Sequence, residues 1–405
     1  MKRGMRPGHT LQLLEGGRQL FDAMVKAMDQ AQSFVWVETY ILQASNDVLQ
    51  VLEALERAAQ RGLDVRLLVD AVGTPKPDAL WVQRFQQAGV QVQVFRPMGR
   101  LGLLIPSRWR RLHRKLCLVD GGVGFCGGIN LIDDLDDVAL GRLDQPRLDF
   151  ALQVQGPLLI ELQDTMARLW RRTSIVHDVS QRDFTSAWAH WQTQRHTNEH
   201  ANKFTLKSDA ATVYAAQAAL LLRDNILHRH DIERAYLKAI GEARQNIVIA
   251  NAYFIPGRRL RRALRLAVQR GVKVQLLIQG KYERFLQYHA ARPVHAALLK
   301  AGVEIYEYAP SALHAKVAVV DARWATVGST NLDPLSLLLA REANVATTDR
   351  PFALALQARL QGLVQSQGTP LNLTILHNRP WWQRWQDGLA FAIMRAVLFL
   401  TGHRY

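Results

Sequence analysis

The chain has 405 residues, of which 48% are hydrophobic and 21% are charged, an ordinary balance for a folded protein with room for two domains. The formal net charge of +16 favours a polyanionic partner, either nucleic acid or an acidic membrane surface. Two cysteines exclude a disulfide framework, and no cluster of cysteine and histidine has the spacing of metal ligands, so we expect neither a metal nor a cofactor.

The N-terminal residues 1–17 are basic and then polar, and they lack the apolar stretch of a signal peptide. No segment reaches the roughly 20 uninterrupted apolar residues that span a bilayer. These features predict that the protein folds in a water-filled compartment, for which the cytoplasm is the simplest choice.

Predicted helices and strands alternate along the first half of the chain, and the second half repeats their order. In each half a helical pattern is followed by an apolar, β-rich run, and two later helices end at a glycine before a strand. The matching segments are 23–42 and 235–255, 58–65 and 267–274, and 88–90 and 301–303. This alternation indicates α/β units that occur twice.

The repeat predicts an α/β fold with two similar lobes, each a mixed, largely parallel sheet flanked by helices. We expect a pseudo-two-fold axis to relate the lobes, with the active site between them. A polar stretch rich in His, Gln and Thr marks the connection between the lobes. The predicted organisation is a first lobe at 8–180, a connection at 181–208, a second lobe at 209–368 and a tail at 369–405.

One short motif occurs once in each half with the same internal spacing. It reads H-x-K-x-x-x-x-D and is followed by G-[GS]-x-N. Its defining residues are His113, Lys115, Asp120 and Asn130 in the first copy, and His314, Lys316, Asp321 and Asn331 in the second. Three fixed residues at this spacing arise by chance about once in 10⁴ starting positions, so two copies at matching places in a repeat indicate a shared chemical function.

The spacing within the motif predicts which residues share a face of a strand. His113 and Lys115 are two apart, so their side chains point the same way. Asp120 is seven residues from His113 and points to the opposite face of a regular strand. It is therefore expected to be a structural carboxylate rather than the partner of the histidine. The same reasoning applies to Asp321 and His314 in the second copy.

Histidines that move protons need a carboxylate to orient the ring. Asp149 follows the first motif and Glu342 follows the second, each before an apolar, strand-like run. We expect each carboxylate to hold one imidazole, and a plain surface charge is the alternative.

The two cysteines are predicted to lie on one hairpin. A turn at residues 121–122 would place Cys117 opposite Cys126. Their counterparts in the second copy are Ala318 and Val327, which favours a packed apolar core over a redox pair.

The duplicated motif resembles the signature of the phospholipase D superfamily, and the resemblance extends over residues 8–365. Within that superfamily, segments 324–345, 11–17 and 38–40 are similar to the bacterial cardiolipin synthases. One branch of that group carries N-terminal membrane-spanning helices. This chain lacks them and resembles the shorter, peripheral branch.

The resemblance implies phosphatidyl transfer in two steps at phosphorus, without a metal. His113 would attack and form a phosphohistidine, and His314 would act as acid and then as base. The motif carboxylates Asp120 and Asp321 complete the catalytic set. The expected binders of the phosphate oxygens are Lys115, Lys316, Asn130, Asn331 and Ser329. Two molecules of phosphatidylglycerol would give cardiolipin and glycerol.

Two segments have the composition of a membrane interface. Residues 99–111 combine arginines with Leu104, Ile105 and Trp109, and the tail carries three tryptophans before an apolar run. These tryptophans are Trp381, Trp382 and Trp385. The alternatives are an ordinary basic loop and a tail packed onto the lobes. We expect peripheral binding to anionic phospholipid on the cytoplasmic face of a bacterial inner membrane.

Two competing functions remain to be weighed. A nuclease or other phosphodiesterase of the same superfamily would share the motifs and the basic charge. Basic residues interleaved with aromatics, as in nucleic-acid channels, are not concentrated near either motif, so we expect no nucleic-acid partner. A membrane-binding scaffold without activity leaves two intact motifs unexplained. The sequence leaves the acceptor alcohol open among phosphatidylglycerol, phosphatidylethanolamine and glycerol.

Overall fold

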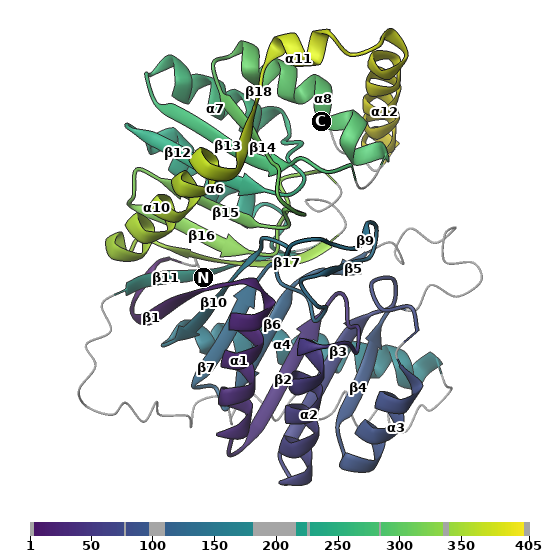
Figure 1. Cartoon of the computed structure of the whole chain (residues 1–405). Helices are drawn as coiled ribbons and strands as arrows, with labels where there is room; N and C mark the ends of the chain where they lie inside the picture. Colours follow the sequence, from purple (N-terminus) through teal and green to yellow (C-terminus); the bar gives the residue numbers. More distant parts are fainter. Residues whose placement is uncertain are drawn as a thin grey trace. The chain divides into compact units, whose positions relative to one another are not determined.

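The computed structural model describes most of the chain (Figure 1). The described residues are 4–76, 78–96, 110–180, 216–224, 227–282, 285–334 and 340–400. The chain forms two compact units. The first comprises residues 1–133 and 151–220, and the second comprises residues 134–150 and 221–405.

The sequence predicts segment 134–150 in the first lobe, but in the structure it belongs to the second unit. It clusters with the second unit because its backbone is bonded there. The Leu148 N–H donates to the Ala312 carbonyl at 2.9 Å, and the His314 N–H donates to the Leu148 carbonyl at 2.9 Å. The predicted connection at 181–208 lies outside the described residues.

A mixed sheet with helices on both faces forms the first unit. Its strand order is β11-β1-β10-β7-β6-β2-β3-β4. The strands are β1 (Arg6–Glu15), β2 (Phe34–Thr39), β3 (Asp64–Asp70), β4 (Gln91–Phe95), β5 (Arg111–Leu112), β6 (Lys115–Val119), β7 (Val123–Gly127), β10 (Phe150–Gln155) and β11 (Ala216–Arg223). The helices are α1 (Gly16–Asp29), α2 (Asp47–Gln60), α3 (Ala79–Ala88) and α4 (Leu158–Ser180).

The second unit repeats this order as β18-β14-β13-β12-β15-β16-β17. Its strands are β12 (Asn246–Asn251), β13 (Lys273–Gln279), β14 (Glu304–Tyr308), β15 (Lys316–Val320), β16 (Trp324–Gly328), β17 (Ala340–Thr347) and β18 (Gly368–Leu371). The helices are α6 (Asp231–Glu242), α7 (Arg258–Gln269), α8 (Phe285–Lys300), α10 (Arg350–Gln367), α11 (Leu373–His377) and α12 (Trp381–Leu400). The short strands β8 (Asp136–Asp137) and β9 (Gly141–Arg142) pair with each other. The predicted α/β fold with two similar sheets is confirmed.

Parallel pairing takes a smaller share of each sheet than the sequence predicts. In the first unit β2, β3 and β4 are parallel, because helical crossovers join them. The motif strands β6 and β7 form a hairpin, which must pair antiparallel, and β10 and β2 flank it antiparallel as well. The second unit has the same division between β12–β14 and β15–β17.

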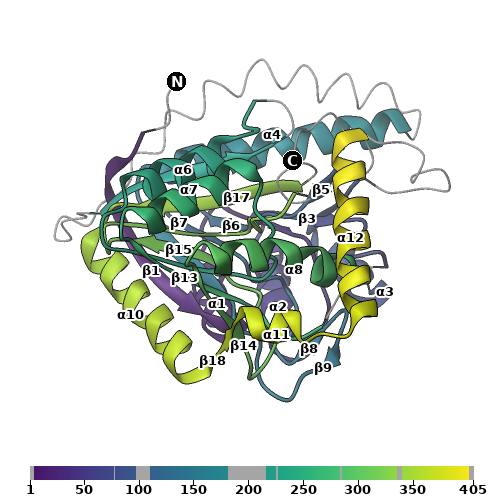
Figure 2. The same cartoon turned by 90° about the horizontal axis from the view of Figure 1, so that it is seen from above.

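Each sheet has helices on both faces, and Figure 2 shows this layering in the second unit for α6, α7, α8 and α10. Helices α6, α7 and α8 share one apolar core with the strands β12–β15. Helix α7 buries Leu260, Leu264 and Ala267 there, at the spacing of one helix face. Helix α10 contacts β15 and β16, and α12 packs along α8. Among the described helices, none has the length and apolarity needed to cross a bilayer.

Candidate active site

The first motif begins at the end of β5 and continues into β6. Lys115 is buried, and its Nζ donates to the His113 carbonyl at 2.6 Å. The Tyr40 ring, just after β2, lies 5.0 Å from the His113 ring between centroids. The Lys115 ammonium lies 5.4 Å from the centre of the same tyrosine ring, a cation–π contact. Tyr40 is thus part of this half of the site.

Asn130 follows β7 and is 2% exposed. Its Oδ1 accepts from the Ile41 N–H at 3.2 Å. That bond directs the oxygen of the amide to the backbone and leaves the amino end to act as a donor to an anionic oxygen. A buried carboxylate at the end of β3 supports the same region, because Asp70 accepts from the Leu112 N–H at 2.8 Å immediately before His113. Sequence reasoning missed Asp70, and its signal is an acidic residue that ends an apolar strand.

The second motif has the same arrangement around β15. The Lys316 Nζ donates to the His314 carbonyl, and the lysine is fully buried. Burial lowers the pKa of Lys316 to about 8, and the nearby carboxylates Asp149 and Glu342 oppose that change. The side chain therefore keeps its charge at neutral pH and loses it as the pH rises through 8.

His314 is held by a carboxylate from a distant part of the chain. The Asp149 Oδ2 lies 2.6 Å from the His314 Nδ1 and 3.6 Å from the Lys316 Nζ. Asp149 is 1% exposed. Because a carboxylate only accepts, the His314 Nδ1 carries the proton in this contact, and the Nε2 is the nitrogen left for chemistry.

This pairing differs from the order of the motifs along the chain. Asp149 follows the first motif but holds the imidazole of the second, because residues 148 and 313 form a parallel bridge. The other predicted carboxylate, Glu342, is fully buried in β17. It accepts a hydrogen bond from the Ser329 Oγ, and that hydroxyl also accepts from the Ala343 N–H at 3.0 Å.

The second motif requires glycine at position 328 for a steric reason. A Cβ atom on Gly328 would lie 2.3 Å from the side-chain amide of Asn344 in β17. That amide accepts from the Thr330 Oγ at 2.8 Å. Only glycine lets β17 approach closely enough to brace the turn that leads to Asn331, which is itself buried.

The motif aspartates have a structural role. Asp120 accepts the backbone N–H groups of residues 32, 33 and 34 at 2.7–2.8 Å, and Asp321 those of residues 244, 245 and 246 at 2.7–2.9 Å. Both have a φ of +52°, in the left-handed region that aspartate tolerates, at the start of a hairpin turn. Each carboxylate therefore ties the motif hairpin to the start of the neighbouring strand.

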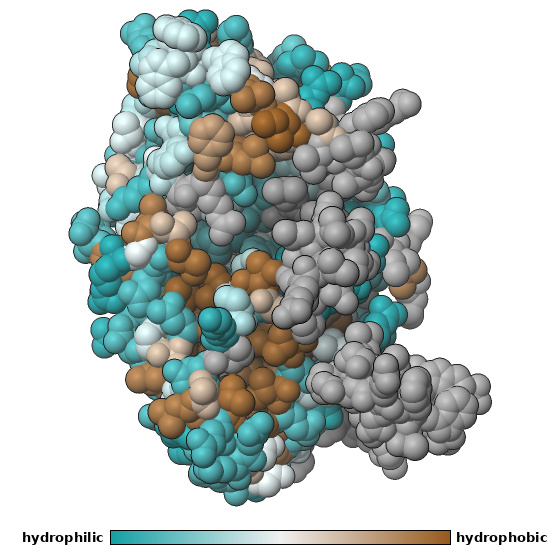
Figure 3. Space-filling view, turned by 90° about the vertical axis from the view of Figure 1, so that its right-hand side faces the viewer, coloured by the Kyte–Doolittle hydropathy of each residue, from teal (hydrophilic) through white to brown (hydrophobic). Residues whose placement is uncertain are grey.

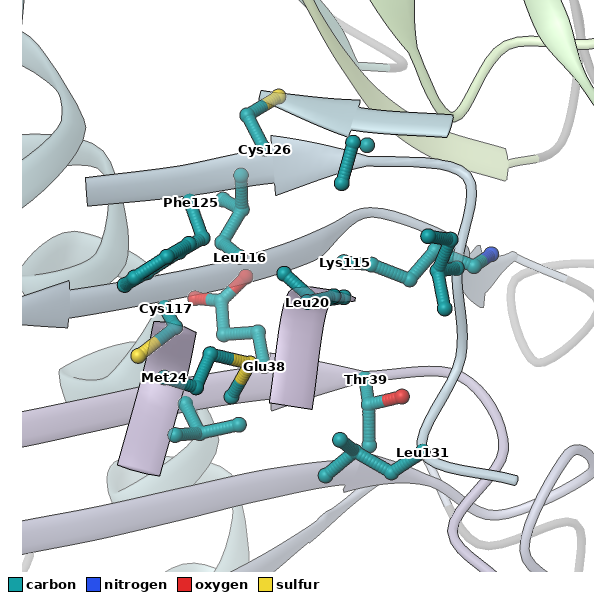
Figure 4. Close-up of a pocket in the computed structure, with 14 residues that line it drawn as sticks. Leu20, Met24, Glu38, Thr39, Lys115, Leu116, Cys117, Phe125, Cys126 and Leu131 are labelled. Atoms are coloured by element: carbon teal, nitrogen blue, oxygen red, sulfur yellow. The ribbon is translucent and has the colours of Figure 1, made fainter. Parts of the chain in front are cut away.

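The cysteines lie on the predicted hairpin but not opposite each other. Cys117 pairs with Phe125, and Cys126 pairs with Leu116. A shift of one residue puts the two thiols on opposite faces of the sheet, and Figure 4 shows them pointing apart. Both are buried thiols outside any disulfide, and burial raises the pKa of the Cys117 thiol. They line a small, mostly apolar cavity beneath the first motif.

The expected membrane residues fall into two groups. Leu104, Ile105 and Trp109 lie outside the described residues. The three tail tryptophans begin α12, with exposed fractions of 79%, 48% and 64% for Trp381, Trp382 and Trp385. In the upper part of Figure 3, apolar side chains reach the surface on the side where α12 lies.

The chain is similar to known proteins over most of its length. A family model described as cardiolipin synthase, PLD-like domain, matches residues 24–134 and 236–364. Cardiolipin synthase B of Salmonella typhi is 36% identical over 413 residues, with 99% of this chain and 92% of that protein covered. Cardiolipin synthase B of Escherichia coli (strain K12) is 35% identical over 403 residues, with the same coverage.

Two solved structures share the fold at low identity. The phosphatidylserine synthase of Haemophilus influenzae Rd KW20 matches with a TM-score of 0.66 at 14% identity, covering 98% of this chain and 97% of that one. The polyphosphate kinase of Porphyromonas gingivalis matches with a TM-score of 0.54 at 12% identity, covering 94% of this chain and 53% of that one. Because the family model includes both motifs and the relatives align over nearly the whole chain, the chain belongs to the cardiolipin synthase family of phospholipase D-like phosphatidyltransferases.

Proposed function

We propose that this enzyme joins two molecules of phosphatidylglycerol into cardiolipin and releases glycerol through a phosphohistidine. The observation that carries the proposal is the intact duplication of the motif. Each copy presents an imidazole beside a buried lysine and a buried asparagine. In the proposed mechanism the two copies would supply a nucleophile, a proton carrier and four donors to a phosphate.

In the first step the His113 imidazole attacks phosphorus, and the bond from phosphorus to the glycerol oxygen breaks. The proton on the His314 Nε2 passes to that oxygen, so glycerol leaves as a neutral alcohol. His314 suits this role because Asp149 holds its Nδ1 at 2.6 Å and stabilises the imidazolium.

In the second step a hydroxyl of another phosphatidylglycerol attacks the phosphohistidine. Its proton passes to His314, the nitrogen–phosphorus bond breaks, and His113 is restored. Lys115, Lys316 and the two motif asparagines would bind the non-bridging oxygens in both steps. Water must be kept from the intermediate, because its attack gives phosphatidic acid instead of cardiolipin.

The proposal is tested with purified protein, labelled phosphatidylglycerol and EDTA. We expect labelled cardiolipin and an equal amount of glycerol, since each transfer releases one glycerol. Labelled glycerol added as a competing acceptor shows whether the enzyme also uses a free alcohol, because its use gives labelled phosphatidylglycerol. Absence of both cardiolipin and phosphatidic acid would refute the lipid substrate, and cleavage of single- or double-stranded DNA would favour a nuclease.

We further propose that the enzyme binds peripherally to the cytoplasmic face of the bacterial inner membrane through α12. One face of this helix packs on the unit through Ala390 and Met394, and Asp387 lies 2.6 Å from His289 of α8. The opposite face is apolar. It carries Trp381, Trp382, Trp385, Leu389 and Ile393, all at least 41% exposed.

These five apolar residues recur at the spacing of one helix face. The same helix also carries the exposed residues Arg384 and Arg395. Tryptophan favours the headgroup level of a bilayer, and arginine attracts anionic lipid. One face of α12 therefore packs on the second unit while the opposite face can contact a membrane. The two alternatives for the tail, packing and interfacial binding, are compatible.

Replacing Trp381, Trp382 and Trp385 together with serine is expected to weaken binding to anionic vesicles at least tenfold. Each tryptophan contributes about 1 kcal/mol when half of its apolar surface leaves water. Cosedimentation with phosphatidylglycerol vesicles measures the effect. Leu354→Ser, which changes an apolar residue of α10 that is 48% exposed, is the matched control and should bind normally. Unchanged binding of the triple variant would contradict the assignment.

A further inference from the structure

The ring of Tyr40 contacts both charged-group residues of the first motif. Its centre lies 5.0 Å from the centre of the His113 ring and 5.4 Å from the Lys115 Nζ. The Lys115 Nζ in turn donates to the His113 carbonyl at 2.6 Å. The three residues therefore hold one another, and the tyrosine ring limits the rotamers that the imidazole can adopt.

The loop after β3, residues 71–74, fixes the backbone of Tyr40. The Thr74 Oγ1 donates to the Tyr40 carbonyl at 3.1 Å and accepts from the Leu42 N–H at 2.9 Å. A Cβ atom on Gly73 would lie 2.1 Å from the Tyr40 carbonyl oxygen and 2.9 Å from the Cδ2 atom of its ring. Glycine at this position therefore lets the loop close against Tyr40, and the buried Thr74 hydroxyl holds it there.

The same loop is tied to the backbone that carries the imidazole. Asp70, the last residue of β3, accepts from the Thr74 N–H at 2.8 Å through its carbonyl. Its Oδ2 accepts from the Leu112 N–H at 2.8 Å, immediately before His113. One buried aspartate and the loop that follows it thus set the backbone on both sides of the contact between Tyr40 and His113, which is how a preorganised site is held.

The second copy of the motif is held in a different way. Strands β2 and β12 pair with their motif strands in the same register. Tyr40, one residue after β2, therefore corresponds to Ala252, one residue after β12. Alanine has no ring to offer, and Asp149 lies 2.6 Å from the His314 Nδ1 and 3.6 Å from the Lys316 Nζ instead. The fold itself does not require the tyrosine, so its presence in the first copy points to a role specific to His113.

We infer that Tyr40 is a positioning residue for the nucleophile, because its ring holds the His113 imidazole in the orientation from which it attacks phosphorus. The inference rests on the proposed function and deepens it. His113 is half-buried, so without the ring its imidazole gains rotamers from which the nitrogen does not reach phosphorus. A small misplacement of a reacting group costs up to about 10²-fold in rate. The contact is made by the ring, so phenylalanine should serve as well as tyrosine.

The test uses the full-length enzyme and phosphatidylglycerol in detergent micelles, with initial rates of cardiolipin formation. Tyr40→Leu keeps an apolar side chain of similar bulk but removes the ring. It is expected to lower kcat by about 10- to 100-fold and to leave KM within threefold, because positioning acts on the reaction and not on lipid binding. Tyr40→Phe should keep at least half of the wild-type kcat.

A phosphatidyl donor with a nitrophenol leaving group isolates the step that Tyr40 serves. Its first step needs no proton from an acid, so the single-turnover release of nitrophenol reports the attack by His113 alone. Tyr40→Leu should slow this release by the same factor as it lowers kcat, and Tyr40→Phe should restore it.

A second variant covers the possibility that Tyr40→Leu folds poorly. Thr74→Val removes the hydroxyl that holds the Tyr40 backbone and changes no atom of either ring. It should lower kcat at least threefold, and by less than twofold when it is added to Tyr40→Leu, because both changes act through one contact.

Tyr288→Leu is the matched control. The Tyr288 ring also lies beside a histidine and a cation, at 5.3 Å from the His289 ring and 4.2 Å from the Arg292 guanidinium, but on α8 and away from both motifs. The same substitution there should leave kcat unchanged.

A kcat of Tyr40→Leu within twofold of wild type would overturn the positioning role. Equal losses in Tyr40→Leu and Tyr40→Phe, or a change in KM alone, would overturn it as well. If the wild-type enzyme forms neither cardiolipin nor phosphatidic acid, the proposed function fails first and the positioning role fails with it. The two failures are therefore distinguishable.

Discussion

Replacing His314 with glutamine is expected to lower cardiolipin formation by about 10⁴-fold, and His113→Gln should do the same. Each change removes one member of a pair that acts as a unit, either the nucleophile or the proton carrier. Initial rates with labelled phosphatidylglycerol measure the loss, with equal melting temperatures as evidence of folding. Retention of a tenth of the activity in either variant would contradict the catalytic assignment.

The same two variants separate the roles of the histidines. A phosphatidyl donor with a leaving group that needs no proton, such as a nitrophenol, bypasses the acid in the first step. His314→Gln should then accumulate a labelled phosphohistidine at residue 113, while His113→Gln should form none. The reverse result would exchange the nucleophile and the proton carrier.

Asp149→Asn is expected to have the second largest effect, lowering the turnover number by about 10²–10³-fold. The carboxylate holds the proton of His314 on Nδ1 through a 2.6 Å contact, and an asparagine amide removes the charge that stabilises the imidazolium. The KM for phosphatidylglycerol should change much less, because Asp149 is buried and does not itself bind the phosphate in the proposed mechanism.

Asp321→Asn is the matched control for this prediction. Asp321 is also a carboxylate of the second unit, but it accepts three backbone N–H groups and takes no part in the proton transfer of the proposed mechanism. Its replacement should lower the melting temperature by several degrees, and any loss of activity should follow the loss of folded protein. If the activity of Asp149→Asn fell only in proportion to the loss of folded protein, the role of Asp149 in positioning His314 would be refuted.

The spacing of residues along the chain was sufficient to predict much of the fold and to propose the site residues. Alternating helix and strand patterns predicted two α/β units, and the two copies of the motif predicted the histidines and lysines of each half. Strand parity predicted that Asp120 does not face His113. In the structure Asp120 lies just past the end of β6 and has a φ of +52°, so the turn and not the parity of a regular strand sets its direction. These inferences needed only residues within one element or one hairpin.

Contacts between distant segments were decided only by the tertiary structure. Asp149 holds His314, 165 residues away, because segment 134–150 is bonded to the second unit. The hairpin register, offset by one residue, separates the thiols of Cys117 and Cys126. Sequence spacing shows which face a residue shares with its neighbours, but not which distant segment packs against that face.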